Sequence, residues 1–299
     1  MPIPLLFVVT MSACLAVGVG KKEVSKNYSD TQGGFFCFNA LYGLVCAFTL
    51  WTLAGFSVQA SCFTLLLGAV FGVVTLCSTL FNLRALTLGS WAYTTVIGSV
   101  STLIPTLSGA IFWDERIGGF QIVGIVLMAV SIALSVKRDE NDKKGGWQWL
   151  LFAVLSGVCT GLIGVLQKVH QTSAHKGEVI AFLLVAFAIL CCSSLLATLF
   201  WKWQNKGEKV FSLVENGRNW KLKFSVLAVL AGVCVALNNV INLHLSGVVD
   251  SAVFFPIVNG GNLLLTILLA TVLYKEKMTK IQYVGLLCGI LAVICLCMK

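Results

Sequence analysis

Hydrophobic and polar positions in this chain alternate in long blocks rather than within single turns or strands. Apolar stretches of about 20 residues recur along the whole chain, and short polar or charged segments separate them. About 20 apolar residues in a helix cross the roughly 30 Å hydrocarbon core of a bilayer, so each stretch predicts a membrane span. The pattern predicts ten spans: 3–20, 34–54, 62–83, 90–112, 119–136, 147–167, 179–200, 222–243, 250–273 and 281–298.

A passage in the middle of the chain returns near its end. Residues 113–128 read WDERIGGFQIVGIVLM and residues 274–289 read YKEKMTKIQYVGLLCG, which pairs Glu115 with Glu276 at an offset of 161. An earlier match, LLFVV at 5–9 with LLFAV at 150–154, has an offset of 145. Two homologous halves of five helices each explain the repeats and the ten spans together.

The repeat defines three parts of the chain. Residues 1–136 form the first five-helix repeat, residues 137–146 (KRDENDKKGG) a hydrophilic linker, and residues 147–299 the second repeat. Because five is an odd number, the halves enter the membrane in opposite orientations. The predicted fold is therefore an all-α integral membrane protein, with ten transmembrane helices arranged as two inverted five-helix repeats. Such halves can exchange conformations, which is the basis of alternating access.

Composition and charge support this class. Hydrophobic residues make up 58% of the chain and charged residues 11%, unlike a soluble protein. The net charge of +9 lies in the loops, so it indicates orientation and contact with anionic lipid, and no nucleic-acid partner is expected. One set of alternate loops holds 17 of the 21 Lys and Arg residues, which predicts that both termini lie outside. The spacing of the 12 cysteines predicts neither a metal site nor a cofactor.

The two copies WDERIGGFQIVG and YKEKMTKIQYVG, each preceded by a polar-aromatic helix, resemble the EamA type of the drug/metabolite transporter superfamily. The resemblance spans nearly the whole chain. It implies a ten-helix secondary carrier of small metabolites or drugs, often an exporter, with a central cavity between the halves. Members of this superfamily more often have both termini in the cytoplasm, so the orientation stays open between the resemblance and the charge count.

The polar groups inside the predicted spans are amides and hydroxyls, because all 12 acidic residues lie in loops or near helix ends. An embedded carboxylate is typical of proton-coupled exporters of cationic drugs, and its absence argues against that function. Amides and hydroxyls suit a neutral or zwitterionic ligand, although hydrogen bonds between helices are the simpler explanation for any single residue. The candidate substrate-binding residues are Asn39, Tyr42, Tyr93, Ser99, Ser101, Asn238, Asn239, Asn242, Asn259 and Asn262.

Residues at helix ends and in helix contacts have mainly structural interpretations. Lys168 is expected to extend to the membrane interface, with recruitment of a substrate carboxylate as the alternative. Glu115 is expected to act as a helix-end or ion-pair group. The GxxxG pair Gly68 and Gly72 predicts close helix packing, and Pro105 predicts a kink in the fourth span.

These observations predict a multi-pass protein of the cell membrane that acts as a secondary active transporter. The expected substrate is a small polar metabolite, an amino acid or related zwitterion, moved by alternating access, with export as the expected direction. Coupling to a proton or another ion, and a monomeric or homodimeric state, are left open. The alternatives are a multidrug or organic-cation exporter and a non-transporting membrane scaffold. An enzyme is not expected, because no catalytic motif and no cluster of acid, base and nucleophile occurs.

Overall fold

The computed structural model describes residues 3–27, 31–89, 94, 97–115, 118–136, 146–211, 220–272 and 280–298. Every element in these ranges is a helix, and none of them contains a strand. The elements are α1 (Ile3–Asn27), α2 (Gln32–Leu53), α3 (Cys62–Leu88), the 3₁₀ helix η1 (Ser99–Thr102), α5 (Leu103–Phe112), α6 (Gly119–Val136), α7 (Trp147–Thr172), α8 (Val179–Gln204), α9 (Trp220–Val248), α10 (Ser251–Val272) and α11 (Lys280–Cys297).

Six helices of the described ranges are long and apolar enough to cross a membrane: α1, α2, α3, α7, α8 and α9. Two shorter apolar helical segments, Leu103–Phe112 and Tyr283–Ala292, accompany them. A helix satisfies its own backbone hydrogen bonds, which is the condition for placing a chain in hydrocarbon. The structure is therefore that of an all-α, multi-pass membrane protein. Each predicted span overlaps one of the helices, with η1 and α5 together in the place of 90–112.

The chain divides into two compact units, and each is described by itself. Unit 1 contains Met1–Met11, Cys77–Gln171 and His244–Lys299, and unit 2 contains Ser12–Leu76 and Thr172–Leu243. Each unit thus combines segments from both predicted repeats. The boundaries of the units do not follow the boundary between the sequence halves, because a repeat is defined by sequence similarity and a unit by spatial contact.

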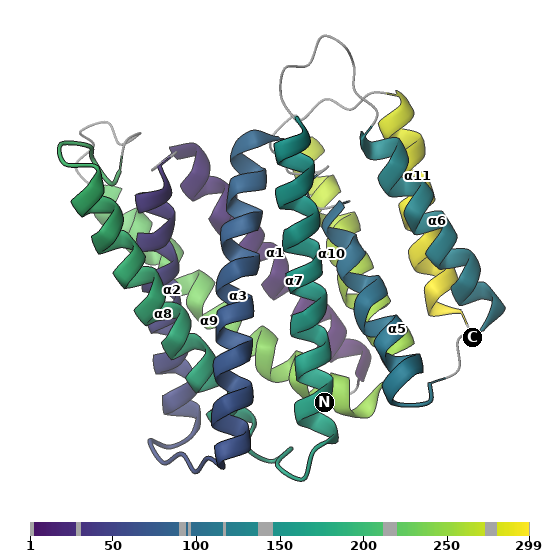
Figure 1. Ribbon diagram of the computed structural model, residues 1–299, viewed down its shortest axis with the longest axis horizontal. Helices are drawn as coiled ribbons and strands as arrows, with labels where there is room; N and C mark the ends of the chain where they lie inside the picture. The colour runs from purple at the N-terminus through teal and green to yellow at the C-terminus, as the bar shows by residue number, and fades with distance from the viewer. Residues whose placement is uncertain are drawn as a thin grey trace. The chain divides into compact units, whose positions relative to one another are not determined.

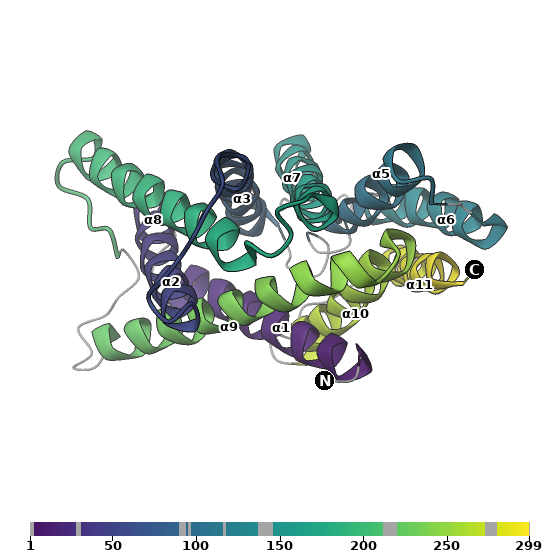
Figure 2. The ribbon, with the colours of Figure 1, turned by 90° about the horizontal axis from the view of Figure 1, so that it is seen from below.

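In unit 1, α6 runs alongside α11, as both views show (Figure 1, Figure 2). The Ser131 hydroxyl of α6 donates to the carbonyl oxygen of Gly285 in α11 at 2.6 Å. Helix α7 packs against η1 and α5, where Gly157 lies against Gly98. Small residues let these backbones come close together. Gly157 therefore acts as a packing residue of α7.

In unit 2, α2 runs alongside α8, and α3 packs against the same helix (Figure 1, Figure 2). Gly68 and Gly72 of α3 face the backbone carbonyls of Phe182 and Ala186, so the predicted close packing of this GxxxG pair is confirmed. Beside them the rings of Phe71 and Phe182 meet edge to face with centroids 5.0 Å apart, and both side chains are fully buried. Packing of this kind stabilises helix contacts where lipid supplies no hydrophobic driving force.

Candidate functional site

Unit 1 contains a layer of hydroxyl and amide side chains near the middle of its helices. Gly157 of α7 lies against Gly98 and Gly161 against Ile104, so α7 runs parallel to η1 and α5, and Thr160 is level with Thr102. The hydroxyl oxygens of Thr160 and Ser78 are 2.8 Å apart. We call two groups at this level the polar layer: Ser78, Ser156 and Thr160, which hydrogen bonds join, and Ser101, Thr102 and Asn259, in which Asn259 contacts Thr102.

Asn259 joins the layer from α10, which runs antiparallel to α7. Its Nδ2 donates to the Thr102 hydroxyl at 3.5 Å, a long hydrogen bond. Asn259 shares one face of α10 with Phe255 and Asn262 at i, i+4 and i+7 spacing, and Phe255 lies against Gly164 of α7. The structure therefore brings Asn259 together with the Thr102 hydroxyl of η1 and places Asn262 on the same helix face.

The helix of the fourth predicted span changes from 3₁₀ to α geometry inside the polar layer. Residues Ser99–Thr102 form η1 and residues Leu103–Phe112 form α5. Pro105 lies in the first turn of α5 and has no N–H to donate to the Ser101 carbonyl four residues earlier. The predicted kink thus takes the form of a discontinuity between two helix types. Ser101 and Thr102 are buried at this point, with Ser99 in the same 3₁₀ turn.

Three asparagine candidates lie on α9 in unit 2, and their contacts are mostly local. Asn242 Nδ2 donates to Asn238 Oδ1 at 3.4 Å, and the Cys14 thiol donates to the same oxygen at 3.5 Å. Asn239 Nδ2 donates to the Val235 carbonyl at 2.9 Å, one turn back along its own helix. Asn242 Oδ1 is buried and has no hydrogen-bond partner among the described residues.

Asn39 and Tyr42 lie on α2 at a different height of unit 2. The rings of Phe38 and Phe224 are 5.8 Å apart, and Gly232 lies against Val45, so α2 and α9 run parallel. Along α9, Asn238 lies about 12 residues beyond the point that is level with Asn39 of α2. At 1.5 Å per residue this is about 18 Å along the helix axis. Asn39 is fully buried, and neither atom of its amide has a hydrogen-bond partner in the described ranges. The candidates of unit 2 therefore form two groups.

A buried ion pair lies at one end of unit 1. Lys168 Nζ is 3.0 Å from Glu115 Oε1, and the two side chains are only 11% and 14% exposed. The same carboxylate accepts from the backbone N–H of Ser251, at 3.3 Å to Oε1 and 3.1 Å to Oε2. Ser251 is the first residue of α10, where an amide has no partner within its helix. Glu115 therefore connects the end of α5 with both α7 and α10.

The local sequence holds Glu115 in this position. Asp114 adopts a left-handed backbone conformation, with φ 52°, directly after α5. The backbone N–H groups of Trp113 and Glu115 then both donate to the Gly109 carbonyl, at 3.0 and 3.2 Å. A Cβ atom at Gly109 would collide with the Glu115 carboxylate, so this close approach needs glycine. The expectation that Glu115 acts as a helix-end and ion-pair group is confirmed, and the ion pair of Lys168 with Glu115 adds a partner that the sequence did not indicate for this lysine.

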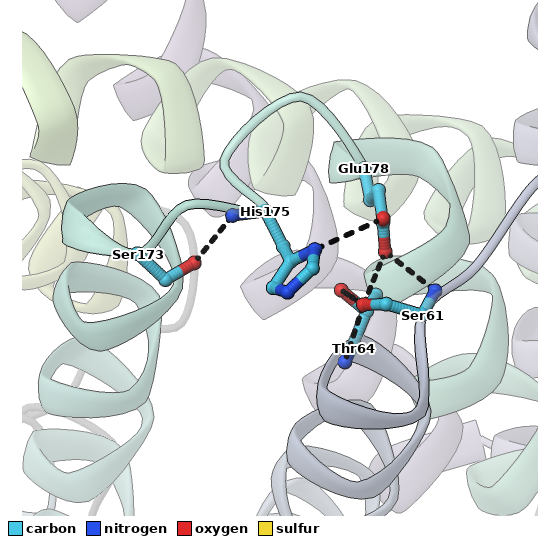
Figure 3. Close-up of polar contacts among 5 residues, drawn as sticks. All are labelled: Ser61, Thr64, Ser173, His175 and Glu178. Carbon is cyan, nitrogen blue, oxygen red and sulfur yellow. Dashed lines mark hydrogen bonds and ion pairs between the residues drawn. The ribbon is translucent and has the colours of Figure 1, made fainter.

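A second carboxylate cluster lies in the loops of unit 2 (Figure 3). Glu178 Oε2 accepts from the backbone N–H and from the hydroxyl of Ser61, both at 2.9 Å, and Oε1 lies 3.3 Å from His175 Nδ1. Ser61 directly precedes α3, and its hydroxyl lies 3.1 Å from that of Thr64. The Ser61 N–H, followed by the Thr64 side chain, lowers the pKa of Glu178 to about 2.

Sequence reasoning missed the Glu178 cluster, although two short spacings pointed to it. Ser61 and Thr64 have the i, i+3 spacing of an N-terminal cap, and His175 and Glu178 have the same spacing just before α8. Of the predicted site residues, Tyr93 lies outside the described residues. The described part of the chain contains no group of three or more His, Cys, Asp and Glu side chains able to hold a metal ion.

Comparison with known proteins agrees with this architecture. A solved structure described as a crystal structure of a protein aligns with 97% of this chain and 95% of its own length, with a TM-score of 0.62 at 16% sequence identity. That likeness shows a shared fold. No curated protein matches the sequence. A family model described as the EamA-like transporter family matches residues 145–298, which is more than half of the chain. The chain therefore belongs to the EamA-like transporter family of the drug/metabolite transporter superfamily, and is a membrane transporter by family.

Proposed function

We propose that this protein is a secondary active transporter that moves a small polar metabolite, an amino acid or related zwitterion, by alternating access. Export across the cell membrane is the proposed direction. The observation that carries the proposal is the polar layer of unit 1, where Asn259 contacts the Thr102 hydroxyl beside the change from 3₁₀ to α geometry. Transporter sites commonly use discontinuous helices near the middle of the bilayer, because broken helices offer backbone groups to a ligand.

The chemistry of the layer suits an uncharged or zwitterionic ligand. Hydroxyls and amides both donate and accept hydrogen bonds, and in the described residues the layer contains no carboxylate. The Ser78 and Thr160 hydroxyls are accessible at mid-height, where lipid would disfavour polar groups. An organic cation would find no counter-charge in such a layer, so the exporter of cationic drugs is the weaker proposal.

The proposed arrangement is ten spans in two inverted five-helix repeats. Its support is that helices in equivalent repeat positions pack on each other, α6 on α11 and α2 on α8. A two-fold relation makes equivalent elements meet at the axis. The repeat offset of 161 makes Ala292 the equivalent of Ser131 and Gly124 the equivalent of Gly285. The contact of Ser131 with Gly285 therefore has Ala292 and Gly124 as its equivalent pair, and all four residues are buried.

The proposed substrate-binding residues in unit 1 are Ser101, Asn259 and Asn262, with Tyr93 and Ser99 from the same span. In unit 2 they are Asn39, Tyr42, Asn238, Asn239 and Asn242. Support is strongest for Asn39 and Asn242, because each has a buried amide atom without a hydrogen-bond partner in the described ranges. An unsatisfied buried polar group costs about 1–3 kcal/mol, which a bound polar ligand or a water molecule relieves.

The test is a ligand screen followed by a flux measurement. Thermal unfolding of the purified protein in detergent is recorded with amino acids, organic cations, nucleosides and sugars, since a ligand of the native state raises its apparent stability. Efflux of the best ligand from proteoliposomes is then compared between the wild type and Asn259→Leu. We expect saturable flux and a loss of roughly tenfold or more in the variant, because an amide inside the layer is replaced by an apolar group. Stabilisation by cations alone, or unchanged flux in the variant, would overturn the proposal.

A further inference from the structure

One end of unit 2 brings several helix ends together. Gly33, near the start of α2, lies against the Trp201 ring near the end of α8. The Thr31 hydroxyl, just before α2, donates to the carbonyl oxygen of Val210 in the loop that follows α8, at 3.0 Å. The start of α2, the end of α8 and this loop therefore lie at the same level of unit 2 (Figure 1).

Aromatic rings bring the start of α9 to the same end. The centroid of the Phe211 ring lies 5.0 Å from that of Trp220 and 5.0 Å from that of Phe224. Because Phe211 directly follows Val210, α9 begins beside the loop after α8. The exposed lysines of these segments form one set, which we call the basic end: Lys202, Lys206, Lys209, Lys221 and Lys223.

The opposite end of unit 2 differs in charge. Its loops, residues 54–61 and 173–178, contain one lysine, Lys176, and one carboxylate, Glu178. Segments 201–211 and 220–224 contain the five lysines of the basic end and one carboxylate, Glu208. Helices α2, α8 and α9 are long and apolar enough to cross a membrane, so each end of unit 2 meets one membrane surface. Positive charge is in excess at one surface and balanced at the other.

Exposed apolar side chains accompany the lysines. Phe200 and Trp203, in the last turns of α8, are exposed, and their rings stack with centroids 6.0 Å apart. Leu222, between two lysines of α9, is exposed as well. Aromatic residues at the ends of spans lie at the membrane interface, and lysine stems extend from there toward the headgroups. The basic end therefore offers cations and apolar contact at the same level.

We propose that the basic end binds the headgroups of anionic phospholipids in the surrounding membrane. A phosphodiester whose headgroup has no cation keeps a net negative charge, which complements several ammonium groups, whereas phosphatidylcholine supplies its own cation. A soluble phosphate would satisfy the lysines but would leave the exposed rings and Leu222 without an apolar partner. The inference goes beyond the proposed function and does not depend on it, because it concerns the lipid around the protein and not the transported molecule.

The expected selectivity follows from exposed charge. Each lysine near an anionic leaflet strengthens association by roughly fivefold. The lysines are exposed, so salt screens them, with a Debye length of about 30 Å at 0.01 M and about 3 Å at 1 M. Lys221 Nζ lies 5.9 Å from the centroid of the Trp220 ring, at the outer limit of a cation–π contact. The preference for anionic lipid should therefore depend on both lysine charge and ionic strength.

The experiment measures which lipid associates with the full-length protein in phosphatidylcholine vesicles. Electron spin resonance gives the association constant of spin-labelled phosphatidylglycerol relative to that of spin-labelled phosphatidylcholine. One variant replaces all five lysines of the basic end by glutamine, and a second replaces them by arginine and keeps the charge. Lys176→Gln, at the opposite end of unit 2, is the matched control. If the glutamine variant does not fold, Lys221→Gln combined with Lys223→Gln takes its place.

We expect the wild type to favour phosphatidylglycerol by at least about twofold at low salt, because selective positions at the basic end are averaged with the rest of the lipid shell. The glutamine variant should lose most of this preference. The arginine variant and Lys176→Gln should keep it. Salt at about 1 M should reduce the preference of the wild type, since it screens exposed charges.

Three results would overturn the proposal. The first is equal association of the two lipids with the wild type, and the second is an unchanged preference in the glutamine variant. The third is an equal loss in Lys176→Gln, because the position of the lysines would then be irrelevant. A parallel series adds inorganic phosphate or glycerol phosphate at constant ionic strength. Displacement of the labelled phosphatidylglycerol by either would show a site for soluble phosphate and exclude the lipid as its specific ligand.

Discussion

Two carboxylates in this protein, one in each unit, hold a helix N-terminus that comes from the other half of the sequence. Glu115 accepts from Ser251 N–H at the start of α10, and Glu178 accepts from Ser61 N–H just before α3. The cations differ: Glu115 pairs with Lys168, and Glu178 with His175. The burial differs as well, since the side chains of the first pair are 11% and 14% exposed and those of the second 41% and 24%.

The comparison indicates that a carboxylate that caps a helix N-terminus depends on its paired cation only where water is excluded. Exposed ion pairs contribute little, because water solvates both charges. A carboxylate that is mostly buried has no such substitute, and removing its cation leaves a charge without compensation. We therefore expect the Glu115 cluster to depend on Lys168 and the Glu178 cluster to depend on its hydrogen bonds with Ser61 and Thr64.

The largest expected effect is that of Lys168→Met. The substitution leaves the Glu115 carboxylate with the Ser251 N–H but without its cation, and it should lower the free energy of unfolding by about 3 kcal/mol. Thermal or denaturant unfolding in detergent measures the change. Lys202→Met, at an exposed position of α8, is the control and should have little effect. If Lys168→Met lowered the free energy of unfolding no more than Lys202→Met, the N–H of Ser251 at the start of α10 would be sufficient for Glu115 without a cation.

The second prediction concerns the pair as a unit. Combining Glu115→Gln with Lys168→Met removes both charges, and the double variant should be more stable than Lys168→Met alone by about 1–2 kcal/mol, because contacting residues are not additive. The glutamine side-chain oxygen can still accept from Ser251 N–H. The same unfolding measurement on the wild type, both single variants and the double variant completes a double-mutant cycle. Additive losses would contradict the strong coupling that burial implies.

The fold was the part most accessible to sequence reasoning, because hydrocarbon permits few alternatives to the helix. Long apolar runs predicted the positions of α2, α7 and α8 closely, and Gly68 and Gly72 predicted a close helix contact. The contact of Asn242 with Asn238 follows from their spacing, because residues four apart on a helix are neighbours. All of these features follow from the spacing of residues within single helices.

The candidate site was less accessible, because it depends on which helices meet. Glu115 and Lys168 are far apart in sequence, and nothing in either segment indicates the other, so their ion pair was not predicted. Asn39 and Asn238 appear as one class of residue in the sequence but lie at different heights of unit 2. Residue type predicted that the site residues are amides and hydroxyls, whereas which of them lie together depends on how the helices pack.

The third prediction is a loss of stability in acid that depends on Glu178. Its pKa falls from 4.5 to about 2 in the folded protein, chiefly because Ser61 N–H donates to the carboxylate. A folded-state pKa below the unfolded one stabilises the protein above pH 4.5, and the stabilisation is lost as the pH falls toward 2. Unfolding temperatures of the wild type and Glu178→Gln should therefore differ at pH 7, and the difference should shrink below pH 4.5 and disappear near pH 2. A constant difference across this range would contradict the assignment.

The smallest expected effect is that of His175→Gln, which sharpens the comparison with Lys168. The His175 ring stacks on Phe63 with centroids 5.7 Å apart and lies 3.3 Å from Glu178, but the carboxylate keeps both bonds from Ser61 without it. The unfolding temperature should change by no more than about 1–2 °C at pH 7, as for most surface substitutions. Ser61→Ala, which removes only the hydroxyl donor, is the matched comparison and should have the larger effect. If His175→Gln destabilised the protein as much as Lys168→Met, burial would not be the property that separates the two clusters.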